Sequence, residues 1–293
     1  MDDASCVRPQ RTLARAATVA GWGYWSGADV RVEFRPAEPD TGLVFVRCDV
    51  SPASRVPARY DCRVDVHRRT VLECDGVRVE MVEHVLAALA GLRIDNCEIW
   101  VDAPELPGLD GSCAPLVSAL LQAGVVTQDK PRRQLVVDTV LRVGDAESWV
   151  EARPAEADGL FIEYQLDYGP ENSIEPQVYR AQLTPTVFCE EMAASRTFLL
   201  EEEAVFLQQA GFGHHVRHSD LLVFGPDGLI DNELRYENEC ARHKALDLVG
   251  DLALAEQDLN GTIVAHRGGH RLNVELVAAL VDAQAPVHCA RSA

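Results

Sequence analysis

The order of hydrophobic and polar positions predicts strands and helices in both parts of the chain. Apolar and polar residues alternate in DVRVEFRPA (29–37) and TGLVFVRCDV (41–50), a period of two that is typical of half-buried strands. From Met81 to Leu92, MVEHVLAALAGL places apolar residues at helical spacing, and SCAPLVSALLQAG (112–124) predicts a second helix. The first part of the chain therefore combines sheet and helix.

The polar stretch TQDKPRRQ at 127–134 interrupts this periodicity and predicts a domain boundary. After it, the order of strand and helix begins again. Strands are predicted in LVVDTVLRV (135–143), SWVEARPA (148–155), LFIEYQLDY (160–168) and GTIVAHRGG (261–269), and helices in RHKALDLVGDLAL (242–254) and RLNVELVAALVDA (271–283). With roughly 150 residues per domain as a guide, we expect two α+β domains, residues 1–126 and 130–293.

The two halves can be aligned on each other. EHVLAALAG and RHKALDLVG match without a gap and pair His84 with His243 and Gly91 with Gly250, each pair 159 residues apart. A chance match between helical sequences is the alternative to a true duplication. If the repeat is real, histidines on equivalent helices would converge across a pseudo-twofold interface.

His243 and Asp247 stand four residues apart in RHKALD and therefore share one face of a helix. They predict either two metal ligands or an ion pair on the surface. A catalytic zinc ion takes three protein ligands, and His84 is the third candidate. Its neighbour Glu83 fits a general base. The alternative is a half-buried structural histidine and a solvated helix face with Asp247 and Lys244.

Other polar side chains also have two interpretations. Thr197 in AASRTFLLEEE would donate to an oxyanion or cap the helix that follows, and capping is the simpler interpretation. His270 in GGHRLN stands where a loop meets a helix and a polar cap is common. Asp251 lies four residues after Asp247 on the same predicted face. The histidines of GHHVRH (213–218) are expected to face solvent without a metal.

Charge and cysteine pattern limit the partners. The 46 acidic and 27 basic residues give a net charge of −19, which repels nucleic acid and anionic membranes, so an anionic substrate needs a local basic pocket. Nine cysteines spread singly argue against a disulfide framework and favour a reducing cytoplasm. No signal-peptide core or 18-residue apolar span is found. We expect a cytoplasmic monomer without stable membrane insertion.

Several motifs in a fixed order carry a resemblance to a known family. They are MVEHVLAALAGLRIDNCEIWVDAPELPGLDGSCAP, SRTF, ELRYENECARHKALDLVGDLAL and GGHRLN. The chain resembles, nearly end to end, the UDP-3-O-acyl-N-acetylglucosamine deacetylases, the zinc amidases of lipid A synthesis in Gram-negative bacteria. The resemblance implies two similar domains, each a helix layer on a β-sheet, with the helices sandwiched between the two sheets.

The resemblance also implies roles for particular residues. The zinc ligands would be His84, His243 and Asp247, and the general base would be Glu83. The general acid would be His270, oriented by the carboxylate of Asp251, and Thr197 would be the oxyanion donor. The implied reaction hydrolyses the acetamide on the glucosamine nitrogen of UDP-3-O-acyl-N-acetylglucosamine. Iron(II) would suit the same ligands.

The substrate contacts are implied in the same way. Lys244 and Arg267 would meet the diphosphate, Tyr168 would stack on uracil, and Phe198 follows the oxyanion threonine as in the family motif. The acyl chain would run through an insert at about 199–224.

The chain departs from the family pattern in three places. GWGYWSG has Trp25 where the family usually has histidine, GHHVRHSD replaces a Gly-rich stretch, and DYGPEN lacks the usual Asn-His-Pro. These changes leave two alternatives to the deacetylase. One is a zinc amidase that acts on a different acylated amino-sugar, and the other is a catalytically silent paralogue that binds a nucleotide-sugar.

Overall fold

The computed structural model describes residues 7–170 and 172–284. The N-terminal half contains a five-stranded sheet in the order β2, β3, β9, β4, β5. Its strands are β2 (Ala17–Trp22), β3 (Asp29–Pro36), β4 (Leu43–Arg47), β5 (Ser54–Pro57) and β9 (Cys97–Val101). The helices are α1 (Glu83–Gly91) and α2 (Ala114–Ala123). The predicted strands and helices of this half are confirmed.

The C-terminal half contains a second sheet in the order β12, β13, β19, β14, β15, and β11 also pairs with β19. Its strands are β11 (Gln134–Val136), β12 (Leu141–Gly144), β13 (Trp149–Arg153), β14 (Leu160–Leu166), β15 (Gln177–Gln182) and β19 (Asp258–His266). Its long helices are α5 (Glu239–Leu252) and α6 (His270–Gln284).

The two sheets have the same strand order and the same strand directions. In each sheet the last strand in sequence lies in the centre, pairs in parallel with one neighbour (β4 with β9, β14 with β19), and pairs antiparallel with the other. In both halves a long helix precedes the central strand and another follows it. This shared topology supports the duplication that the aligned helices predicted.

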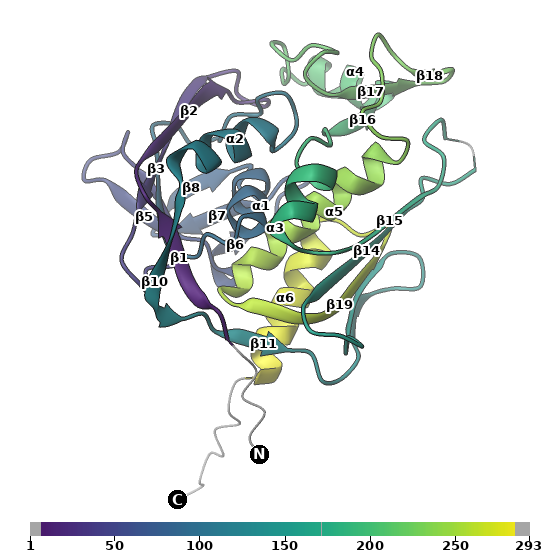
Figure 1. Ribbon diagram of the computed structural model, residues 1–293. Helices are drawn as coiled ribbons and strands as arrows, with labels where there is room; N and C mark the ends of the chain where they lie inside the picture. The colour runs from purple at the N-terminus through teal and green to yellow at the C-terminus, as the bar shows by residue number, and fades with distance from the viewer. Residues whose placement is uncertain (1–6, 171, 285–293) are drawn as a thin grey trace, which may run out of the picture.

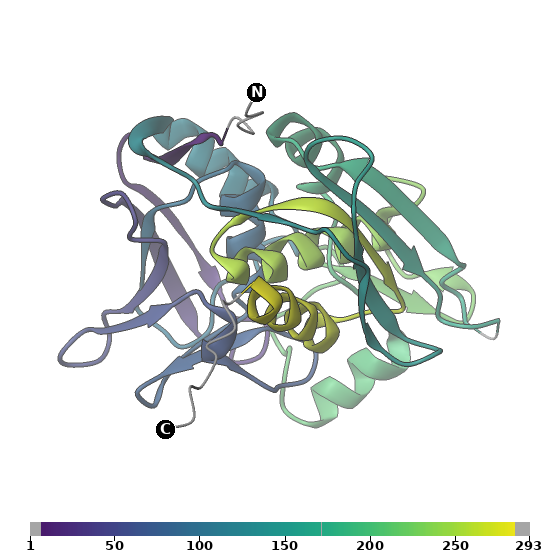
Figure 2. The same cartoon turned by 90° about the horizontal axis from the view of Figure 1, so that it is seen from below.

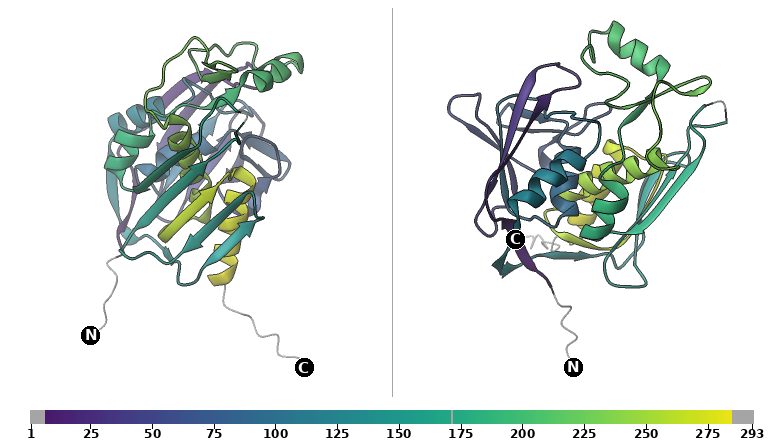
Figure 3. Two further views of the ribbon diagram at one scale, coloured as in Figure 1. Left: turned by 90° about the vertical axis from the view of Figure 1, so that its right-hand side faces the viewer. Right: turned by 45° about the horizontal axis from the view of Figure 1, so that its top comes forward.

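The four long helices lie between the two sheets, as Figure 1 shows from the side and Figures 2 and 3 show from other directions. α1 and α5 pack closely because Gly250 has no side chain: a Cβ at this position would lie 2.1 Å from the carbonyl oxygen of Glu83. Gly91, its counterpart in the alignment, faces the ring of Phe188. The α+β sandwich expected from the resemblance is confirmed.

Two segments differ from what their sequence pattern indicated. The polar stretch at 127–134 is mostly a strand, since β10 (Val125–Pro131) pairs antiparallel with β1 (Pro9–Leu13). The proposed boundary between 126 and 130 therefore falls inside a strand, and the two-domain division stays a prediction. The single strand expected at 135–143 is divided into β11, which pairs in parallel with the central strand β19, and β12, which pairs antiparallel with β13 at one edge of the sheet.

Smaller elements surround the sandwich. β6 (Arg63–Val64), β7 (Val71–Cys74) and β8 (Val77–Glu80) form one three-stranded sheet, and β16 (Phe198–Leu200), β17 (Leu222–Gly225) and β18 (Gly228–Leu229) form another. α3 (Pro185–Val187) is a short helix, and α4 (Glu201–Gln209) stands with β16–β18 at the top of Figure 1. Among the described residues, none of the helices has the length and apolar character needed to span a bilayer.

Candidate metal centre

Three buried side chains converge where α1 packs on α5. His84 is the second residue of α1, and His243 and Asp247 lie one turn apart on α5. Each offers one ligand atom, and these atoms lie within 4.8 Å of one another. The Nε2 atoms of His84 and His243 are 3.5 Å and 3.6 Å from the same oxygen of Asp247. This is a His-His-Asp arrangement that could hold a metal ion.

The protonation of these groups fits metal binding. Burial lowers the pKa of His243 to about 3, so its imidazole is neutral, as a metal ligand must be. Its Nδ1 lies 3.2 Å from the carbonyl oxygen of Ser195, which leaves Nε2 free to coordinate. Burial opposes ionisation of Asp247, but the positive charge of the nearby Lys244 holds the pKa of Asp247 well below the usual range.

Lys244 belongs to this group as well. Its Nζ donates to Asp247 Oδ2 at 3.0 Å, and the carboxylate of Asp247 is only 5% exposed. The interpretation of Asp247 and Lys244 as a solvated helix face is therefore wrong. His84 is also buried, with its ring centroid 5.1 Å from that of His243.

Glu83 lies beside the three ligands at the start of α1. Burial raises the pKa of its carboxyl group. Oε2 accepts a hydrogen bond from the backbone N–H of Thr70 at 2.9 Å, while Oε1 lies 3.9 Å from Nε2 of His270. One oxygen is thus fixed by the backbone. The other faces the polar centre, the group formed by His84, His243, Asp247, Glu83 and His270.

His270 is the first residue of α6, and its Nδ1 bonds Oδ2 of Asp251 at 2.8 Å. Burial by itself would lower the pKa of His270, but the negative charges of Asp251 and Glu83 outweigh it and raise the pKa to about 9. Asp251 is fully buried on α5, one turn after Asp247. The structure therefore brings together His270 and the carboxylate expected to orient it.

Thr197 lies next to β16, at the edge of the same centre. Its side chain donates to the carbonyl oxygen of Gly111 at 3.1 Å. α4 begins at Glu201, after β16, and the residue before it is Leu200. The interpretation of Thr197 as the cap of that helix is therefore wrong, because a strand separates the two.

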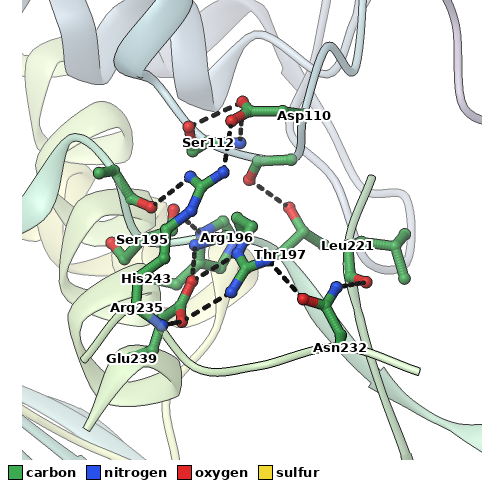
Figure 4. Close-up of polar contacts among 12 residues, drawn as sticks. Asp110, Ser112, Ser195, Arg196, Thr197, Leu221, Asn232, Arg235, Glu239 and His243 are labelled. Atoms are coloured by element: carbon green, nitrogen blue, oxygen red, sulfur yellow. Dashed lines mark hydrogen bonds and ion pairs between the residues drawn. The ribbon is translucent and has the colours of Figure 1, made fainter. Parts of the chain in front are cut away.

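A buried ion pair that the sequence did not predict holds this segment in place. Arg196 Nε donates to Glu239 Oε1 at 2.8 Å, and Arg196 Nη1 donates to Asn232 Oδ1 at 2.9 Å (Figure 4). Glu239 is the first residue of α5 and is completely buried. Because Ser195 and Thr197 flank Arg196, this pair fixes both the backbone partner of His243 and the threonine.

Comparison with known proteins identifies the family. Residues 10–282 match the family described as UDP-3-O-acyl N-acetylglycosamine deacetylase. The chain belongs to this family. The resemblance seen in its motifs is thereby confirmed, and the family places the chain among deacetylases.

Individual members of the deacetylase family are similar over nearly their whole length. A protein of Anaeromyxobacter sp. strain Fw109-5 named UDP-3-O-acyl-N-acetylglucosamine deacetylase is 38% identical over 92% of this chain and 87% of its own. Proteins of the same name from Actinobacillus pleuropneumoniae serotype 3 and Shewanella sp. strain W3-18-1 are 34% and 36% identical, over 93% and 94% of this chain and 90% of their own length.

A cavity of about 400 Å³ opens over the polar centre of this deacetylase family member. Tyr168, Phe198 and Lys244 line it, with ring centroids of Tyr168 and Phe198 5.9 Å apart. Its apolar lining includes residues of the insert predicted at about 199–224, among them Leu207. Arg267 is not part of the lining, and its Nη2 instead donates to Asp167 at 2.7 Å.

Trp25, which departs from the family pattern, lines the same cavity. Its ring lies 5.5 Å from that of Phe212 in an edge-to-face arrangement, and the guanidinium of Arg69 lies 4.2 Å from its centroid. The substitution therefore lies against the insert, through Phe212.

Proposed function

We propose that this chain hydrolyses the N-acetyl group of UDP-3-O-acyl-N-acetylglucosamine and releases acetate and the free amine, the committed step of lipid A synthesis. The observation that carries the proposal is the convergence of His84, His243 and Asp247 within 4.8 Å, beside Glu83 and His270. Membership of the deacetylase family supports it. We place the reaction in the cytoplasm and expect the protein to act as a monomer.

Zinc suits the proposed ligands because two imidazoles and one carboxylate are a common set for a catalytic zinc ion. His84, His243 and Asp247 would hold it, and iron(II) would suit the same donors. When bound, the metal ion supplies Lewis-acid polarisation of the acetamide carbonyl.

Glu83 is proposed to take a proton from the attacking water. Its pKa is raised by burial, which makes it a stronger base than an exposed carboxylate, and Oε1 is the oxygen that faces the centre. The backbone N–H of Thr70 holds Oε2 and so prevents the carboxylate from turning away.

His270 is proposed to be the general acid. Its raised pKa keeps the imidazole protonated at neutral pH, so it can stabilise the developing anion and then protonate the leaving amine. Asp251 holds Nδ1 and aims Nε2 at the reaction. Thr197 would exchange its bond to Gly111 for one to the oxyanion.

The cavity supplies the proposed substrate contacts. Lys244 is a local cation in an otherwise acidic protein and would face the phosphates, and Arg267 would join it by exchanging its bond to Asp167. Tyr168 and Phe198 would pack against the nucleotide and sugar, and the apolar lining of the insert would take the acyl chain.

The test is acetate release by the purified chain, measured on UDP-3-O-acyl-N-acetylglucosamine and on the same nucleotide-sugar without the acyl chain. Faster release from the acylated substrate is the expected result. A metal-loaded protein that releases acetate only from another acylated amino-sugar would favour the amidase alternative, for which the Trp25 substitution is the supporting observation. A protein without stoichiometric metal and without release would favour the silent paralogue.

A further inference from the structure

Thr70 lies at the junction between the small β6–β7–β8 sheet and the polar centre. It directly precedes β7, and its side chain is completely buried. It does not line the cavity, and it has no chemical role in the proposed hydrolysis. Its polar groups nevertheless contact the proposed base, Glu83, and Asp251, the carboxylate that orients the proposed acid.

The hydroxyl group of Thr70 contacts the acid side of the centre. Oγ1 donates to Oδ1 of Asp251 at 2.6 Å. The other carboxylate oxygen, Oδ2, accepts from His270 Nδ1 and from Asn273 Nδ2, each at 2.8 Å. The bond from Thr70 is therefore the one that holds Oδ1 and fixes the rotation of the carboxylate plane.

The backbone of Thr70 contacts the base side of the centre. Its N–H donates to Oε2 of Glu83 at 2.9 Å, and its carbonyl oxygen accepts from the N–H of Val82, the residue before α1. Glu83 and His270 then face each other across 3.9 Å. Thr70, Asp251, His270 and Glu83 form a closed ring, with Thr70 and Glu83 from the N-terminal half and the other two from the C-terminal half.

We infer that Thr70 is a positioning residue for the hydrolysis, because it ties the carboxylate of the general base to the carboxylate that orients the general acid. The inference rests on the proposed function. The backbone bond sets Glu83, and the hydroxyl bond sets Asp251 and through it His270. A side chain without a donor would leave a buried carboxylate oxygen unpaired and free the Asp251–His270 pair to rotate.

The test uses Thr70→Val, which keeps the shape of the side chain and the backbone bond to Glu83 but removes the hydroxyl. We expect a kcat at least about tenfold lower, the size of loss seen when the hydrogen-bond partner of an active-site group is removed. KM should stay unchanged because Thr70 does not line the cavity. Thr70→Ser, which keeps the hydroxyl, should recover most of the kcat.

Thr12→Val is the matched control for structural damage. Thr12 is also a buried threonine, and its hydroxyl donates to the carbonyl oxygen of Asn96 at 2.7 Å, in the β1 region. Thr12→Val removes this bond and the one that its hydroxyl accepts from the N–H of Ala37 at 3.0 Å, so it should lower the melting temperature at least as much as Thr70→Val does. Only Thr70→Val should lower kcat, and the bound zinc per chain should be the same in both.

Three outcomes would overturn the inference. Thr70→Val with the same kcat as Thr12→Val would do so, and so would a Thr70→Ser variant no more active than Thr70→Val. If Thr70→Val does not fold, Thr70→Cys, whose thiol is a weak donor, replaces it, and a wild-type kcat in that variant contradicts the inference. An inactive wild-type chain would instead refute the proposed function, and the inference with it.

Discussion

At the residue scale, two buried histidines of one centre are driven to opposite protonation states. Burial lowers the pKa of His243 to about 3, and its Nδ1 meets only a backbone carbonyl. His270 is also buried, but the negative charges of Asp251 and Glu83 raise its pKa to about 9. Titratable groups whose environments separate their pKa values are typical of acid and base pairs in enzymes. The local partners thus predict one histidine as ligand and the other as acid.

Replacing Glu83 with glutamine should separate catalysis from metal binding. The substitution removes the proposed base without touching the three ligands, so we expect kcat to fall about 10²- to 10⁴-fold with the bound zinc unchanged. Glu73→Gln is the control, because Glu73 pairs with Arg78 away from the cavity. Steady-state kinetics and metal analysis measure both quantities. A Glu83→Gln kcat equal to that of Glu73→Gln would remove Glu83 from the mechanism.

Replacing Asp251 with asparagine should move the pH dependence of kcat. An acid with a raised pKa keeps its proton as the pH rises and loses it, together with its catalytic activity, only when the pH passes that pKa. Without the charge of Asp251, the main favourable contribution to the raised pKa, the pKa of His270 falls. The alkaline limb of the profile should therefore shift to lower pH. If the Asp251→Asn variant is active and the alkaline limb of its pH profile does not shift, His270 is not the acid.

At the scale of elements, the centre exists because α1 and α5 touch. Gly250 allows this contact, since a Cβ there would lie 2.1 Å from the Glu83 carbonyl oxygen. His84 and Asp247 sit on the two facing helices, so the helix separation sets the distance of 3.5 Å between their ligand atoms. A residue without a side chain at position 250 is thus needed to bring the ligand residues of the two helices together.

Gly250→Ala should force α1 and α5 apart. We expect a loss of about 1–3 kcal/mol in the free energy of unfolding, as in other overpacked cores, together with weaker zinc binding. Gly269→Ala is the matched control, because its Cβ would meet no atom within 4 Å. Urea unfolding and zinc titration compare the variants. Equal stability of the two alanine variants would contradict the close packing of the helices.

The sequence predicted the local parts of this architecture well. The apolar spacing at 81–92 and 242–254 corresponds to α1 and α5, and the alternating segments at 29–37 and 160–168 correspond to β3 and β14. It failed for β10, whose polar residues are held by pairing with β1 more than a hundred residues away. Such pairing leaves no periodic signal in a polar edge strand.

The same limit applies to the site. His84, His243 and Asp247 could be proposed because helical spacing and the repeat place them together, and the structure does bring them within 4.8 Å. Thr70 and the Arg196–Glu239 pair were missed, because their partners are 181 and 43 residues distant in sequence. Only the SRTF motif gave a signal near Arg196, and it pointed to the neighbouring threonine.

At the scale of the whole molecule, a cluster of charged side chains around Arg8 connects the two halves. Its guanidinium donates to both oxygens of Asp95 in the N-terminal half, at 2.7 Å each, and to Asp258 in the C-terminal half at 2.6 and 2.7 Å. Arg132 adds a contact of 3.1 Å to Asp95. The carboxylate of Asp95 is only 3% exposed, so its pairing is needed for stability.

Arg8→Met should therefore weaken the connection between the two halves. Removing the charged donor to buried Asp95 is expected to lower the free energy of unfolding by about 2 kcal/mol, with Arg132 offsetting some of the loss. Arg59→Met, which breaks an exposed pair with Asp61, should cost less than about 1 kcal/mol. Chemical unfolding measures both, and a smaller loss for Arg8→Met than for Arg59→Met would contradict the role of the cluster.

The most direct test of the central claim measures metal content and acetate release on one preparation. We expect about one zinc ion per chain, loss of acetate release from UDP-3-O-acyl-N-acetylglucosamine after chelation, and recovery when zinc is added back. Variants of His84 or His243 to alanine should lose zinc and turnover together. Full acetate release by the metal-free protein would show that this chain is not a metal-dependent deacetylase.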